Sequence, residues 1–166
     1  MSKKTPAKLT KVSVSLPFGL GSAEWTEDPT ERKAAWSLYV ELVTRVALQP
    51  LAIEDGSIRE ALSSLHSLFG VTREVLKAAG PDVATGGLNS VGGIAILTLN
   101  KGLRPFLTKW HIALKNWESG KSPTTSPIDH ESAWSEGDSC RAELEMVRRE
   151  LSKYADALAK IAGVMN

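Results

Sequence analysis

Side chains that could do chemistry are densest between residues 101 and 117, in the string KGLRPFLTKWHIALKNW. At about 100° per residue, the cationic and hydrogen-bonding side chains of this string share one side of a helix. That side carries Lys101, Arg104, Thr108, His111 and Lys115, and no acidic residue follows until Glu118. Arginine, lysine and protonated histidine bind carboxylate and phosphate oxygens strongly, so this face could recognise an anionic group.

A second cationic face occurs on the helix predicted after Ser57. Its members share one side of that helix and are Arg59, Ser63, His66, Arg73 and Lys77. Residues 129 to 150 are instead acidic, with seven Asp or Glu residues against three arginines. This segregation admits two interpretations. Either basic and acidic helices lie side by side with ordinary solvated faces, or the cationic faces meet an acidic partner or a phosphate-bearing ligand.

Other reactive residue types form no recognisable motif. The histidines lie on different segments without an HExxH pattern, so neither zinc binding nor base catalysis is predicted. Cys140 falls at an apolar helix position, where a buried thiol behaves as a small hydrophobe, and Glu143 and Glu150 lack the ExxH pattern of a di-iron bundle site. The loop TGGLNSVGG lacks the GxxxxGKS or GxxxxGKT phosphate-binding pattern, and we expect Gly92 and Gly93 to permit close helix packing. We therefore predict no catalytic residue, metal or cofactor.

Length and composition favour a single cytoplasmic domain. The chain of 166 residues is long enough for a core without disulfides, and its one cysteine cannot form an internal disulfide. Twenty lysines and arginines against nineteen acidic residues leave a net charge of +1, so any nucleic-acid or membrane surface must be local. The N-terminus lacks the apolar run of a signal peptide, and the longest apolar stretch, residues 91 to 99, is shorter than the roughly 20 residues that span a bilayer.

The pattern of the first 25 residues predicts a flexible tail followed by an arm. Residues 1–11 read as a flexible basic tail, and residues 12–166 as one helical-bundle domain. The alternation of Val12, Val14 and Leu16, followed by glycines, predicts a β-hairpin or extended arm that ends near Trp25. Two strands alone are marginal in water, so Leu16, Phe18 and Trp25 are expected to lie against helices.

Four helices are predicted after this arm. The first begins at Asp28 and runs to about Gln49. Its apolar stripe consists of Ala35, Tyr39, Leu42, Val43 and Val46, and Trp36 and Leu38 broaden it. The second runs from the cap Ser57 to Gly80. The third starts at residue 89 or 90 and ends near residue 119, and Pro105 should kink or divide it between residues 101 and 104.

Apolar stripes on the third and fourth helices predict how the helices pack. The buried stripe expected on the third comprises Leu103, Phe106, Leu107, Trp110, Leu114 and Trp117. The fourth, from about residue 127 to 163, has the 4-3 spacing of a coiled-coil seam at Cys140, Leu144, Val147, Leu151, Tyr154, Leu158 and Ile161. The seam could be filled within the chain or by a second copy. The expected fold class is all-α, an antiparallel four-helix bundle with an N-terminal β-hairpin or extended arm and a proline-kinked third helix.

Three strings carry a resemblance to known proteins: ERKAAWSLYVELVTRVALQPL, IREALSSLHSLFGVTREVL and LNKGLRPFLTKWHIALKNWE. They are similar to a group of small, poorly characterised bacterial helical proteins and appended domains of conflict or antiphage gene neighbourhoods. The resemblance covers residues 30 to 118, and Ile112 departs from it, standing where a proline is expected after the Trp-His pair. It implies an accessory or assembly role beside an effector or nucleotide-hydrolysing partner, and it supplies no catalytic residues.

Together with this resemblance, the sequence predicts a non-enzymatic protein-interaction or assembly module, an accessory component of a bacterial multiprotein system for which antiphage defence is one candidate role. A protein partner or a second copy would bind through the last helix and the cationic face of the third. Two alternatives stay open: a nucleic-acid-binding small subunit, and a sensor of an anionic nucleotide held between the second and third helices. The candidate binding residues are Arg59, His66, Arg73, Lys101, Arg104, His111 and Lys115.

Overall fold

The computed structural model describes residues 11–51 and 56–164, which are mostly helical with a short N-terminal sheet. The predicted basic tail lies outside the described residues except for Lys11, which begins the first strand. None of the described helices is both long and apolar enough to cross a membrane.

The N-terminal arm is the predicted β-hairpin. Strands β1 (Lys11–Ser15) and β2 (Ser22–Thr26) pair antiparallel, with Val14 opposite Ala23. One side of this hairpin is apolar and buried, and β1 packs on the final helix. In the turn, Phe18 has a φ of 54° and donates its backbone N–H to the Glu150 carboxylate at 2.6 Å. Its ring covers Gly102, so the arm lies against the helices as predicted.

Helix α1 (Pro29–Val43) begins as predicted but ends early. The Asp28 carboxylate accepts the backbone N–H of Glu31 at 2.9 Å, which caps the first turn. The helix ends at Val43 rather than near Gln49, and a 3₁₀ turn, η1 (Val46–Leu48), follows. The Thr44 hydroxyl donates to the Val40 carbonyl at 2.7 Å, and the helix ends because the backbone of the next residue, Arg45, is extended, with a ψ of 140°.

Helix α2 (Ile58–Ala79) matches its prediction closely. Ser57 caps it by accepting the backbone N–H of Glu60 at 3.3 Å, and Gly80 ends it with a φ of 89°. Two 3₁₀ turns, η2 (Pro81–Ala84) and η3 (Gly87–Asn89), lead to the next helix.

The third predicted helix is divided at the position that Pro105 requires. It consists of α3 (Val91–Leu97), a π-helical segment η4 (Thr98–Leu103) and α4 (Arg104–Ser119). Pro105 has no backbone N–H to donate and stands in the first turn of α4, where that donor is not needed. The wider π turn therefore absorbs the proline without ending the helix.

The fourth predicted helix is two helices, which corrects the sequence-based boundary. They are α5 (Pro127–Ser132) and α6 (Gly137–Ala162), separated by a turn at residues 133–136. The turn brings Trp134 inward, where its ring meets Trp110 edge to face with centroids 5.8 Å apart. It also lets α5 point the buried Glu131 at the start of α2.

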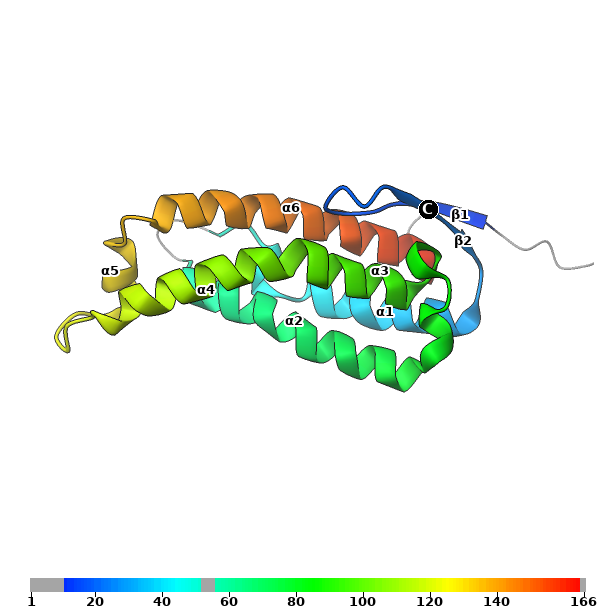
Figure 1. Cartoon of the computed structure of the whole chain (residues 1–166), viewed down its shortest axis with the longest axis horizontal. Helices are drawn as coiled ribbons and strands as arrows, with labels where there is room; N and C mark the ends of the chain where they lie inside the picture. Colours follow the sequence, from blue (N-terminus) through cyan, green and yellow to red (C-terminus); the bar gives the residue numbers. More distant parts are fainter. Residues whose placement is uncertain (1–10, 52–55, 165–166) are drawn as a thin grey trace, which may run out of the picture.

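The long helices lie side by side around one apolar core, and each runs opposite to the one before it (Figure 1). Helix α1 packs against both α6 and α2, and α4 packs against α2. The stripe predicted on α4 is buried, except that Trp117 is half-buried and stacks on His130 at 4.7 Å. All seven predicted seam residues of α6 are buried within this chain, so that seam is not free for a second copy.

Glu31, near the start of α1, makes the stability of the fold depend on pH. Burial raises its pKa from 4.5 to about 7, with a smaller contribution from the charge of Asp28, although the N–H of Val91, which its carboxylate accepts at 3.3 Å, lowers the pKa in part. The folded chain therefore holds a proton between pH 4.5 and 7 that the unfolded chain releases, so the free energy of unfolding falls as the pH rises through this window.

We expect Glu31→Gln to remove this dependence. The amide can still accept the Val91 bond but carries no charge, so the variant should be more stable than the parent at pH 8, by about 1 kcal/mol because the group is partly solvated. At pH 4.5 the two proteins should be nearly equal. Urea unfolding at pH 4.5, 6, 7 and 8 measures the difference, and parallel pH profiles would contradict the raised pKa.

Candidate functional site

A groove of about 350 Å³ lies between α2 and α4. Seven residues line it: His66, Phe69, Arg73, Arg104, Leu107, Thr108 and His111. None of them is acidic. The structure therefore brings together four of the seven sequence-predicted binding residues.

Helical spacing explains why these side chains converge. On α2 the lining residues follow each other at steps of three and four, and on α4 at steps of three, one and three. Side chains at such steps share one face of a helix. Because α2 and α4 pack against each other, the two faces meet and the cations of both helices border one space.

Arg104 is held in place at the groove. Its guanidinium lies over the Phe69 ring, 4.7 Å from the centroid. The Asn100 side-chain oxygen accepts from Nε at 3.2 Å and from Nη2 at 2.9 Å. Neither partner is negatively charged, so the full positive charge of Arg104 stays available to an anion.

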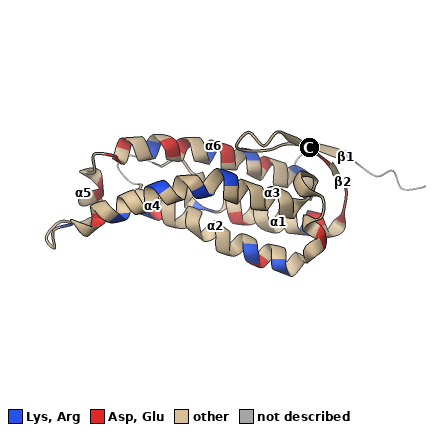
Figure 2. Cartoon of the chain, in the orientation of Figure 1, with Lys and Arg blue, Asp and Glu red and all other residues tan. Residues whose placement is uncertain are grey.

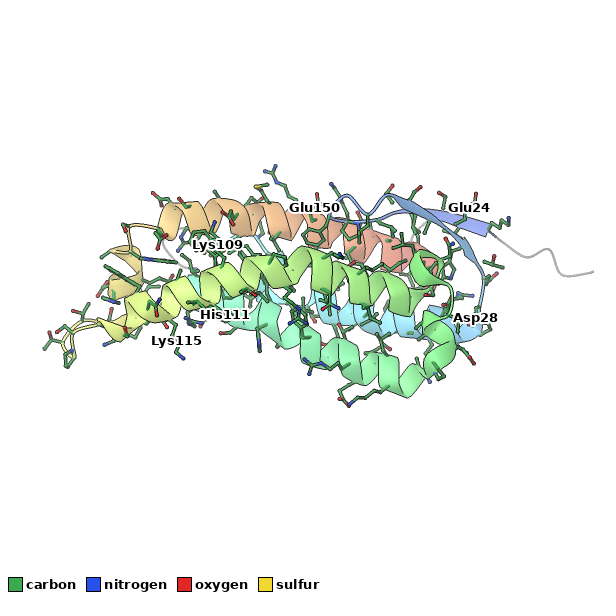
Figure 3. The ribbon with its side chains drawn as sticks, in the orientation of Figure 1. Glu24, Asp28, Lys109, His111, Lys115 and Glu150 are labelled. Carbon is green, nitrogen blue, oxygen red and sulfur yellow. The ribbon has the colours of Figure 1, made fainter. Side chains whose placement is uncertain are left out.

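His111 forms a neutral wall of the groove. The Nη1 group of Arg59 lies 3.0 Å from its Nδ1, and a guanidinium can only donate, so Nδ1 accepts and the proton sits on Nε2. Burial, followed by the charges of Arg59 and His66, lowers the pKa of His111 below 6.5. The backbone of Leu62 has a smaller effect in the opposite direction and raises this pKa. Its ring meets that of His66 edge to face, with centroids 5.5 Å apart. Figure 3 shows His111 on α4 where this helix meets α2.

Arg59 does not line the groove and instead joins two helices. Its Nε and Nη2 groups donate to the two carboxylate oxygens of Glu118, at 2.7 and 2.8 Å. This two-point ion pair joins α2 to the end of α4 and neutralises the cation that the sequence placed among the binding residues.

Lys101 and Lys115 lie outside the groove although they share the cationic side of the helix. Both are exposed, and neither borders the space between α2 and α4. Figure 2 shows the lysine and arginine positions of α2 and α4, and Figure 3 places Lys115 towards the C-terminal end of α4. Among the described residues, no ion pair involves Lys101, Lys115, Arg73 or Arg104.

The floor of the groove and the pairing of Glu118 could not be identified from the sequence. Leu107 belongs to the predicted buried stripe, and Phe69 is an apolar residue of α2. Both pack in the core, but each also borders the groove. Glu118 lies seven residues after His111, two helical turns along the same face. That spacing indicates that Glu118 shares a face of α4 with His111, but it does not indicate which cation Glu118 pairs with.

Cys140 and the glycine-rich loop at residues 85–93 have structural roles. Burial raises the pKa of the Cys140 thiol to about 12, so it is not a thiolate at neutral pH. Gly92 and Gly93 permit close packing, as predicted: a Cβ on Gly92 would stand 2.7 Å from the Val83 carbonyl oxygen, and one on Gly93 would overlap the Gly87 carbonyl.

Comparisons with known proteins found no matching family model, no matching curated protein and no matching solved structure.

Proposed function

We propose that this chain is a non-enzymatic binding module that holds a phosphate-bearing small molecule in the groove between α2 and α4. The observation that carries the proposal is the lining itself. Arg73, Arg104, His66 and His111 border one space that no carboxylate enters. Cationic donors that lack an acidic partner in the protein are the groups that recognise phosphate oxygens.

The size and floor of the groove favour a small ligand. Pockets for small molecules usually measure about 300–1,000 Å³, and the groove lies at the lower end of that range. Phe69 and Leu107 give it an apolar floor beside the cations, and the Thr108 hydroxyl adds a hydrogen-bonding group. A ligand with a charged group and a flat apolar part, such as a nucleoside monophosphate, has matching chemistry.

The state of His111 supports binding rather than catalysis. A general base needs a free nitrogen lone pair facing the substrate. In His111 the Nδ1 lone pair accepts the bond from Arg59, and Nε2 is buried from solvent. The ring therefore shapes the groove, and the arginines supply the charge.

Charge reversal at Arg104 tests the proposal. Isothermal calorimetry with nucleoside monophosphates, and with inorganic phosphate as the minimal probe, should detect binding to the parent protein. We expect Arg104→Glu to weaken it by about 10- to 100-fold, because one hydrogen bond to a charged group contributes roughly 1.5–3 kcal/mol. Arg73→Glu should act similarly.

Lys115→Glu is the matched control. It makes the same charge change on the same helix but outside the groove, so binding should change less than about threefold. Absence of binding by the parent would reject the proposal. Equal losses in both variants, with affinity for single-stranded RNA or DNA that falls steeply with salt, would instead favour the nucleic-acid alternative.

The wider role expected from the sequence, an accessory module within a protein assembly, also remains a proposal. We propose that an antiparallel four-helix bundle is the frame that presents its surfaces. What supports an assembly role is the outer side of α1, where Trp36 is 48% exposed.

A further inference from the structure

Helix α1 carries more apolar surface than the core of this chain covers. Its inner side is buried and consists of Ala34, Ala35, Leu38 and Leu42. Its outer side carries Trp36 and Val40, exposed by 48% and 36%, with Tyr39 and Val43 partly buried beside them. The sequence had placed Trp36 in the inward stripe, which the structure corrects. A helix that is apolar on both sides is expected to be covered on both sides.

A groove of about 590 Å³ lies between α1 and α2. Lys33, which borders it, precedes Trp36 by three residues and is therefore its neighbour on the surface of α1. The floor of the groove is apolar and includes Ala34, Val75 and Ala79. Lys33 borders it on α1 and Glu74 on α2, so its two edges carry opposite charges. Among the described residues no acid pairs with Lys33, and Glu74 is joined only to the exposed Lys77, at 3.5 Å.

We infer that this face binds a second copy of the same chain about a twofold axis. In such an interface, each contact between two different residues occurs twice with the roles exchanged. A partly exposed ring near an apolar groove meets this condition, since Trp36, which stacks on Tyr39 of its own chain with ring centroids 5.7 Å apart, can contact the groove of the other copy. The charges are complementary, because Lys33 of each copy then faces Glu74 of the other and two equivalent ion pairs can form.

The proposed dimer interface is separate from the groove between α2 and α4 that we propose to bind a phosphate group, here called the anion groove. The anion groove uses the face of α2 that carries His66, Phe69 and Arg73, whereas Glu74, Val75 and Ala79 lie on another face of that helix. Self-association and ligand binding can therefore be tested separately.

Sedimentation equilibrium measures the association directly. We expect the parent protein to form dimers at concentrations up to about 100 μM, and Trp36→Glu to raise the dissociation constant at least about 30-fold, as loss of a central tryptophan does in other interfaces. Ile112→Glu is the matched control, because Ile112 is a more exposed apolar residue, at 59%, on α4. It should leave the dimer intact, and a parent protein that stays monomeric throughout would overturn the inference.

A charge exchange tests the twofold geometry. Lys33→Glu alone and Glu74→Lys alone place like charges opposite each other twice, so each variant should be largely monomeric. A mixture of the two variants restores both attractive pairs and should form a mixed dimer. Failure of the mixture to associate would overturn the twofold geometry, even if Trp36→Glu weakens the parent dimer.

Discussion

Gly93→Ala should destabilise the protein by about 2–3 kcal/mol, although alanine is the better helix former. The new Cβ would overlap the carbonyl of Gly87 and stand 2.8 Å from the Ser90 hydroxyl oxygen. Neither group can move freely. The Gly87 carbonyl accepts from the Ser90 backbone N–H at 3.1 Å and from its hydroxyl at 2.7 Å, and that hydroxyl accepts the N–H of Gly93 at 3.2 Å. Relief of the overlap therefore breaks the cap of α3.

Gly70→Ala is the matched control and should have the opposite sign. Gly70 stands in the middle of α2, and a Cβ there meets nothing within 4 Å. Helix propensity alone then predicts a gain of about 1 kcal/mol. Urea unfolding followed by circular dichroism gives both values. An equal increase in the free energy of unfolding in both variants would show that the η3 turn leaves room for a Cβ at position 93.

Glu131→Ala should cost about 3 kcal/mol, because one buried carboxylate holds the start of α2. It accepts the Ile58 N–H at 2.7 Å, the Arg59 N–H at 3.1 Å and the Ser57 hydroxyl at 3.1 Å, and Arg141 lies 3.8 Å away. Free N–H groups and the helix dipole both favour a negative charge at a helix N-terminus. Removal of the carboxylate leaves those donors buried without this acceptor.

Two further variants separate the parts of this effect. Glu131→Gln keeps an accepting oxygen but loses the charge, so we expect about half the loss. Glu136→Ala removes a nearby exposed carboxylate and should change the free energy of unfolding by less than about 0.5 kcal/mol. If Glu131→Ala lowered the free energy of unfolding no more than Glu136→Ala does, the Glu131 cap would not stabilise the fold.

Much of the helical framework could be predicted from the sequence because it rests on short-range chemistry. Asp28, Ser57 and Ser90 each cap a helix through a backbone N–H three residues further along. Pro105 divides the third helix through its missing N–H, a property of the residue itself. The cationic faces that border the groove between α2 and α4 could be predicted from the helical period alone.

The sequence by itself therefore determined where most helices start and which side chains share a face, since those properties depend on neighbours within about one or two helical turns. Only the tertiary structure decided that Arg59 pairs with Glu118, 59 residues away, and that Glu131 caps a helix 73 residues before it. It also turned Trp36 outward and divided the last helix at residues 133–136. The physical reason is that packing between distant helices selects among several faces and charge partners that are equivalent in local energy.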